Sequence, residues 1–232
     1  IIRPNPAQNE LFNSNIRLMT ITFKYFPSLR PIMPNSKKGY LIEKGTIVIQ
    51  RDLTELDLFA RKFLDTLKRH TDYLVVSGFV SICTGRTRGT EDIDILIPAM
   101  GEEKFNALFK ELEKNNFWCY QGDDPGKVYA YIENLNSIRF AKTNEIFPNI
   151  ELVPFNQTKK AKFFEFGHPQ KIKIKDFEFK IPPLEFEILY KEIILRGKKD
   201  IEDAKHLRIF FSEIVSEKKF KEYGPIIRDE IK

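Results

Sequence analysis

The sequence predicts a mixed α/β fold (α+β), in which a mixed β-sheet is flanked by helices and followed by a helical C-terminal part. Short apolar runs rich in β-branched residues, such as 73–76 and 150–153, predict buried strands. Apolar residues at spacings of three and four in 105–112 predict a helix between them. The third observation is a helical pattern that begins after Pro182-Pro183, at a helix start signal.

The elements follow in order along three parts of the chain. Residues 1–45 are rich in Pro, Asn and Ser without a clear period, which predicts an extended N-terminal arm. Residues 46–181 form the α/β domain, and residues 182–232 are the helical part packed on it. Within the domain, 46–50 predicts a strand, and a helix to His70 follows, with Asp52 and Glu55 as its expected cap.

The later part of the α/β domain is expected to contain several short strands. The segments 117–120, 137–141 and 150–153 are short apolar runs that predict three of them. Strict alternation in 171–175, followed by 177–180 after Asp176, predicts two antiparallel strands exposed on one face.

Composition sets the broad class of the protein. Among 232 residues, 42% are hydrophobic and 13% aromatic, enough for a substantial core. The net charge of +5 suits a phosphate-rich substrate such as a nucleotide or RNA. Two cysteines in apolar surroundings predict buried thiols, and three histidines without metal-ligand spacing argue against zinc. The absence of a long apolar run and of a signal-peptide pattern predicts a cytoplasmic protein without a membrane span.

Asp92 and Asp94 lie two residues apart inside an apolar run and predict a metal site. Side chains alternate along a strand, so both carboxylates point to one face, while Ile93 and Ile95 point into the core. Adjacent carboxylates repel each other, and a cation between them removes the repulsion. Mg²⁺ prefers such oxygen ligands and leaves room for substrate phosphates.

The residues before this pair supply a phosphate site. The strand 73–76 ends at Ser77-Gly78, and a short helix over 79–83 follows. Backbone amides at such a strand-to-helix turn can bind phosphate oxygens, and a glycine lets the backbone approach them. A basic loop with Arg86 and Arg88 then leads into the Asp-x-Asp strand.

This order of elements resembles the nucleotidyltransferase superfamily, which has the DNA polymerase β-like catalytic fold. The small prokaryotic and archaeal AbiEii-like proteins look most similar, because the run from Arg88 to Asp94 reads Arg-Gly-Thr-Glu-Asp-Ile-Asp. The resemblance implies that Asp92 and Asp94 hold Mg²⁺ and that Ser77 and Gly78 bind the triphosphate of a nucleotide such as ATP. One departure is Ser77, since a glycine is usual at that position.

A third carboxylate completes the signature of this superfamily, and Glu151 is the candidate. It lies between Ile150 and Leu152 in a strand pattern. Burying an unpaired charge is costly, so an acid at this position indicates a functional role. The alternative is that Glu151 lies on an edge strand and faces water. Glu145 is the alternative ligand, although its surroundings predict a loop.

Two basic residues are further candidates for nucleotide contact. The AbiEii-like proteins carry a lysine on one helix and an Asp-x-x-Asp run on the next, which implies that Lys191 reaches the phosphates. Asp200 and Asp203 are then expected to cap or brace the second helix. Arg88 is the second candidate, because it lies next to the proposed phosphate site. The alternatives are that Lys191 only extends past apolar neighbours and that Arg88 is a solvated loop charge.

Together these features predict an enzyme of the transferase class. It would move a nucleoside monophosphate from an NTP to an acceptor by in-line displacement, with two Mg²⁺ ions, or Mn²⁺, held by Asp92, Asp94 and Glu151. The acceptor could be a protein side chain, a tRNA end or a small molecule. The alternative is an inactive nucleotide-binding or toxin–antitoxin interaction module with the same fold. The residues specify neither the NTP nor the oligomeric state.

Overall fold

The computed structural model describes residues 38–89 and 92–231 of the chain. Most of the expected N-terminal arm, residues 1–37, lies outside this range. Residues 40–43, also expected in the arm, instead form the first strand, β1 (Tyr40–Glu43). The expected mixed α/β class is confirmed, but the strands form two mixed sheets where one was expected.

The larger sheet has five strands in the order β3-β4-β7-β6-β5. They are β3 (Leu74–Val76), β4 (Asp92–Pro98), β7 (Asn149–Phe155), β6 (Ile138–Lys142) and β5 (Phe117–Cys119). The central pair β4 and β7 is parallel, and the other neighbours are antiparallel. Parallel pairing places the first residues of β4 and β7 at the same end of the sheet.

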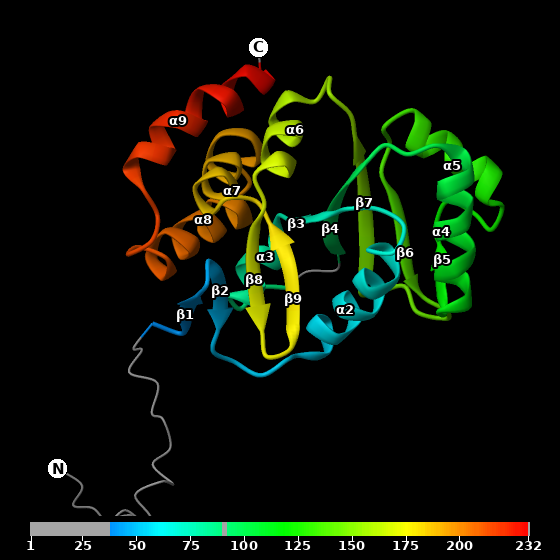
Figure 1. Cartoon of the computed structure of the whole chain (residues 1–232), viewed down its shortest axis with the longest axis horizontal. Coiled ribbons are helices and arrows are strands. Elements are labelled where there is room, and N and C mark those ends of the chain that lie inside the picture. The colour runs from blue at the N-terminus through cyan, green and yellow to red at the C-terminus, as the bar shows by residue number, and fades with distance from the viewer. Residues whose placement is uncertain (1–37, 90–91, 232) are drawn as a thin grey trace, which may run out of the picture. The chain divides into compact units, whose positions relative to one another are not determined.

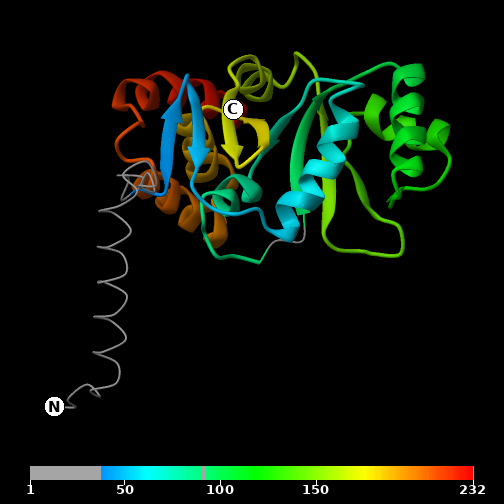
Figure 2. The ribbon, with the colours of Figure 1, turned by 60° about the horizontal axis from the view of Figure 1, so that its bottom comes forward.

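The smaller sheet has the order β1-β2-β8-β9. Its other members are β2 (Thr46–Ile49), β8 (Gln170–Ile174) and β9 (Phe177–Ile181). The expected antiparallel pair of β8 and β9 is confirmed, and β2 joins β8 in parallel. Figure 2 shows the β1–β2 hairpin in blue beside this pair.

One face of the larger sheet lies against α2 (Glu55–Leu67) and α4 (Glu102–Lys114). Phe63 of α2 meets Phe117 edge to face and also touches Phe140, which Phe109 of α4 approaches as well. The isoleucines 93, 95 and 97 of β4 are buried in the same core. The opposite face carries Asp92 and Asp94, and further along it the smaller cluster of Leu74, Leu96 and Phe155.

That opposite face is partly covered by helices that come later in the chain (Figure 1). They are α6 (Lys160–Gly167), α7 (Leu184–Tyr190), the π-helical turn η2 (Lys191–Leu195), α8 (Lys198–Phe210), α9 (Glu217–Arg228) and the short 3₁₀ turn η3 (Asp229–Ile231). Phe164 of α6, Phe186 of α7 and Tyr223 of α9 form one aromatic cluster. The expected helical C-terminal part is therefore present, and α6 joins it.

Some local details differ from the sequence prediction. The cap of α2 is Thr54, whose hydroxyl accepts from the Asp57 N–H while Asp57 accepts from the Thr54 N–H at 2.7 Å; Asp52 and Glu55 do not form it. The helices α5 (Pro125–Glu133) and α6 were not predicted. The short helix α3 (Gly78–Cys83) was predicted, and its observed start differs from the predicted one by one residue. In the ranges that the structure describes, no helix is long and apolar enough to cross a membrane.

Candidate active site

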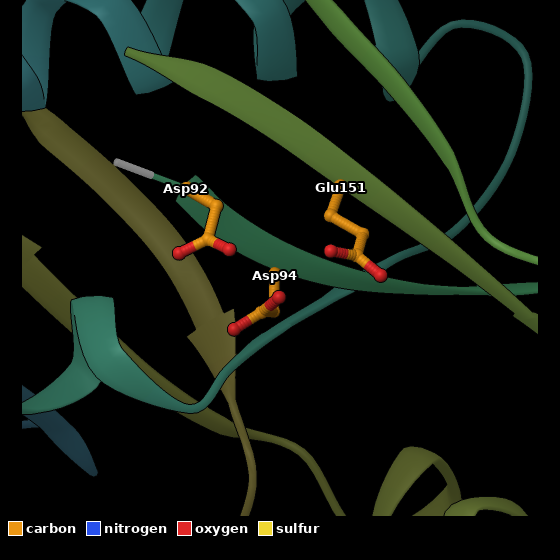
Figure 3. A group of neighbouring side chains, drawn as sticks. All are labelled: Asp92, Asp94 and Glu151. Atoms are coloured by element: carbon orange, nitrogen blue, oxygen red, sulfur yellow. The ribbon is translucent and has the colours of Figure 1, made fainter. Parts of the chain in front are cut away.

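Three carboxylates converge at the centre of the larger sheet. Asp92 and Asp94 lie on β4, and Asp94 pairs in register with Glu151 on the parallel strand β7. One carboxylate oxygen from each residue lies within 4.8 Å of the others. Figure 3 shows the three side chains on one side of the two strands, with their oxygens directed toward a common space. The alternation that predicted their shared face therefore produces an arrangement suited to a divalent cation.

The electrostatics of Asp94 indicate uncompensated negative charge. Its pKa is raised to about 6, first because burial disfavours the ionised form and then because Asp92 repels it. A hydrogen bond from the Ser77 hydroxyl opposes the rise in this pKa, whereas Glu151 adds to it. A bound cation would remove this repulsion, so the donor set fits a hard metal ion.

Arg139 provides part of the missing positive charge. It lies on β6 directly opposite Glu151, and its Nε is 3.1 Å from the Glu151 Oε2. Glu151 raises the pKa of Arg139 through this contact. The sequence analysis did not single out this residue. Its position between the apolar residues Ile138 and Phe140 in a strand was the available signal.

The turn between β3 and α3, which the sequence predicts to bind phosphate, has an unusual backbone. Ser77, between β3 and α3, adopts φ 63° and ψ −131°, a conformation that side chains disfavour and glycine tolerates. A glycine, which the sequence resemblance led us to expect at this position, would adopt this conformation without strain. The retained hydroxyl has a use in this chain, since it donates to Asp94. Thus Ser77 connects the turn to the carboxylates.

Gly78 packs closely against Arg88. A Cβ built on Gly78 would lie 3.1 Å from Nη2 and 3.2 Å from Cζ of Arg88. The Arg88 guanidinium therefore lies directly over the start of α3. Its Nη1 donates to Asp203 of α8.

Asp203 is the centre of a buried charged cluster. It is fully buried and accepts hydrogen bonds from Arg86 and Arg88 of the basic loop. Lys191, also fully buried, places its Nζ 3.3 Å from Asp203 Oδ2 and 3.2 Å from Glu187 Oε1. The expected bracing role of Asp203 thus extends to the loop and to η2. Asp200 is in the first turn of α8.

Glu187 links this charged cluster to the turn. Burial raises its pKa, and Lys191 together with the Ser77 backbone N–H acts in the opposite direction. The predicted nucleotide ligands Ser77, Gly78, Arg88 and Lys191 are therefore connected through neighbouring contacts, although Lys191 is bound within the protein. Contact of these four residues with a nucleotide stays a prediction. The alternative of an exposed Arg88 or a solvent-reaching Lys191 does not describe the structure.

A cavity of about 200 Å³ adjoins the carboxylates. Its lining comes from the sheet, the Ser77 turn, α6, α7 and η2, and consists of Val76, Ser77, Asp94, Leu96, Val153, Lys162, Glu165, Glu187, Tyr190 and Leu195. The sequence analysis did not identify Lys162, Glu165 or Tyr190. The helix α6 has weak apolar periodicity, so no pattern indicated what it faces.

Comparisons with known proteins identify similar solved structures only. No family model matches the chain, and no curated protein is similar to it at a significant level. A lincomycin-bound lincosamide antibiotic adenylyltransferase, LnuA, is 19% identical, with a TM-score of 0.46, over 69% of this chain and 99% of that one. ANT(2'')-Ia in complex with adenylyl-2''-tobramycin is 13% identical, with a TM-score of 0.44, over 77% and 100%. A nucleotidyltransferase-like protein from Paracoccidioides brasiliensis is 16% identical, with a TM-score of 0.46, over 78% and 90%.

Proposed function

We propose that this protein is a Mg²⁺-dependent nucleotidyltransferase that moves a nucleoside monophosphate from an NTP to an acceptor. The observation that carries this proposal is the approach of Asp92, Asp94 and Glu151 oxygens to within 4.8 Å of one another. Such a group of half-buried carboxylates is poorly stable alone and suits two divalent cations bound with a triphosphate. Protein side chains, tRNA ends and small molecules remain the acceptor classes.

Each residue has a role in this proposal. Asp92 and Asp94 hold Mg²⁺, and the Ser77-Gly78 turn at the start of α3 binds the triphosphate. The acceptor hydroxyl oxygen attacks the α-phosphorus, the bond to the bridging oxygen breaks, and pyrophosphate leaves. Glu151 orients the hydroxyl and takes its proton. Cations bound there would lower the hydroxyl pKa and offset charge on the leaving pyrophosphate.

Arg88 and Lys191 are the proposed cationic contacts to the phosphates. Both are paired with Asp203 in the structure. Contact with a nucleotide therefore requires that these groups share their donors between Asp203 and a phosphate oxygen. Arg88 has more donors than its bond to Asp203 uses, because a guanidinium carries five N–H groups.

The second candidate function is nucleotide binding without turnover. The observation that favours it is the ion pair of Arg139 with Glu151. An arginine that neutralises the third carboxylate reduces the negative charge available to a second cation. The same fold would then serve as a binding module, including one in a toxin–antitoxin complex.

Transfer of label separates the two candidates. The full chain is incubated with each α-³²P-labelled NTP, Mg²⁺ and cell extract, and labelled macromolecules and small products are resolved. Glu151→Gln should keep NTP affinity within a few fold and lower transfer by roughly a hundredfold or more, the scale of a lost acid–base or metal contact. Glu145→Gln is the matched control, because this exposed loop acid was the alternative ligand.

The outcomes have distinct meanings. Wild-type transfer in Glu151→Gln would contradict the role of the third carboxylate. Mg²⁺-dependent NTP binding without transfer to any acceptor would favour the binding module.

A further inference from the structure

The cavity next to Asp94 has an apolar body and a polar end. Val76, Leu96 and Val153 form its wall on the sheet, and Leu195 faces it from η2. The polar end comes from α6, which contributes Lys162 and Glu165. Figure 1 shows α6 between α7 and β7. Binding sites for small molecules commonly combine apolar walls with a few polar groups in this way.

Glu165 is buried without a hydrogen-bond partner among the described residues. It is 4% exposed, and its carboxylate forms no hydrogen bond or ion pair with any residue that the structure describes. Burial raises the pKa of Glu165 well above the ordinary value, repulsion by Glu187 adds to the rise, and attraction to Lys162 opposes it. A carboxylate in this setting is destabilising unless donors reach it. Glu165 lines the cavity, so a ligand bound there can supply those donors.

Lys162 is the second ionisable group at this end of the cavity, and it is attracted electrostatically to Glu165 and Glu230. It is half-buried, burial lowers its pKa, and within 38–89 and 92–231 no carboxylate lies in ion-pair distance of its Nζ. Residues three apart on a helix share a face, so Lys162 and Glu165 present a donor and two acceptor oxygens side by side. A complementary ligand therefore offers one acceptor next to two donors.

Guanine has this pattern on one edge. Its O6 accepts, and its N1–H and N2–H₂ donate in parallel, as a carboxylate requires for two-point binding. Adenine offers one donor beside an acceptor, and uracil offers one donor between two acceptors. Cytosine offers one donor beside two acceptors. Only guanine satisfies both oxygens of Glu165 and the ammonium of Lys162 together.

We propose that this cavity binds the base of the nucleotide donor and that Glu165 and Lys162 select guanine. The inference rests on the proposed function, in which Ser77 and Asp94 hold the phosphate end of the NTP. Both residues also line the cavity, so the base and the phosphates occupy one continuous site. The base lies between the apolar sheet wall and Tyr190 of α7.

Binding of non-transferable nucleotides tests this proposal. The α,β-methylene analogues of GTP, ITP, ATP, CTP and UTP are titrated into the full chain with Mg²⁺ by calorimetry. The GTP analogue should bind about tenfold to a hundredfold more tightly than those of ATP, CTP and UTP, the scale of one or two hydrogen bonds to a charged group. The inosine analogue lacks only the N2 amine and should lose about tenfold.

Variants assign the preference to residues. Glu165→Gln should lower affinity for the GTP analogue by about tenfold or more and change affinity for the ATP analogue by less than about threefold. Lys162→Met should weaken binding of the GTP analogue. Lys160→Met, at an exposed position on the same helix, should leave this binding unchanged. Thermal melting of each variant verifies that it folds.

Three results would count against the assignment. Equal affinity for all five analogues, together with loss of binding in Asp94→Asn, would remove the guanine preference and leave nucleotidyl transfer intact. Failure of every analogue to bind in the presence of Mg²⁺ would overturn the proposed function as well. Equal binding of the GTP and ITP analogues would separately exclude the two-donor contact with Glu165.

Discussion

Replacement of Asp203 by alanine should destabilise the protein strongly. The Asp203 carboxylate is fully buried and is shared by Arg86, Arg88 and Lys191. Removing it leaves the buried Lys191 ammonium with Glu187 alone and deprives Arg88 of its ion-pair partner. Loss of one member of a buried pair commonly costs about 3–5 kcal/mol, because a buried charge is left uncompensated.

The expected magnitude lies at the lower end of that range. Glu187 still lies 3.2 Å from Lys191, and Arg86 keeps Glu202 at 2.9 Å. We therefore expect a loss of about 3 kcal/mol in the free energy of unfolding. For a protein of this size, that corresponds to a melting temperature lower by roughly 6–12 °C.

Urea unfolding followed by circular dichroism measures this loss. Glu202→Ala is the matched control, since it removes the other acid from Arg86, but its side chain is 47% exposed. Exposed ion pairs contribute at most about 1 kcal/mol, so this variant should unfold near the wild-type midpoint. Asp203→Asn keeps the shape of the side chain and removes its charge, so it measures the contribution of the charge alone. An Asp203→Ala protein within about 1 kcal/mol of Glu202→Ala would refute the reasoning from burial.

Three further outcomes concern the turn and the carboxylates. Ser77→Gly should be more stable than Ser77→Ala by about 1–3 kcal/mol in thermal unfolding, because both lose the hydroxyl and only glycine tolerates φ 63°; equal stability would exclude backbone strain. The pKa of Asp94 is about 6 in the folded protein and 3.8 ordinarily, so the metal-free native state binds a proton more tightly than the unfolded state does. The free energy of unfolding should therefore fall by about 2 kcal/mol as the pH rises from about 4 to about 6. Urea titrations in the presence of a chelator should show this decrease in stability with pH, and Asp94→Asn should remove it. An unchanged decrease in this variant would mean that another group titrates. Gly78→Val should weaken NTP binding in calorimetry while leaving Mn²⁺ affinity unchanged, since its Cβ displaces Arg88; equal losses of both would contradict a purely local effect.

The carboxylate group was predictable because its geometry follows from local alternation. The period of two along a strand places Asp92 and Asp94 on the face opposite the buried isoleucines. The same rule applies to Glu151 between two buried neighbours. Only the adjacency of β4 and β7 had to be supplied by the fold, and their in-register pairing then brings Glu151 to Asp94.

The remaining parts of the site depend on contacts that no local pattern encodes. Arg139 meets Glu151 because β6 pairs with β7, and Asp203 meets Arg88 across 115 positions of sequence. The helix α6 was missed because few of its residues are buried: Ala161 and Glu165. One of these two is Glu165, and a charged residue at a buried position weakens the apolar periodicity that predicts helices.

The turn that presents Ser77 is held in place by a closed series of contacts. Its hydroxyl donates to Asp94, and its backbone N–H interacts with Glu187, which pairs with Lys191. Lys191 and Arg88 share Asp203, and the Arg88 guanidinium returns to lie over Gly78.

A strained backbone conformation persists only where its surroundings fix it from several sides. For Ser77 those surroundings come from both the sheet and the helices after residue 182. The expected boundary near 181 therefore separates two patterns of sequence, whereas the candidate active site depends on contacts that cross it.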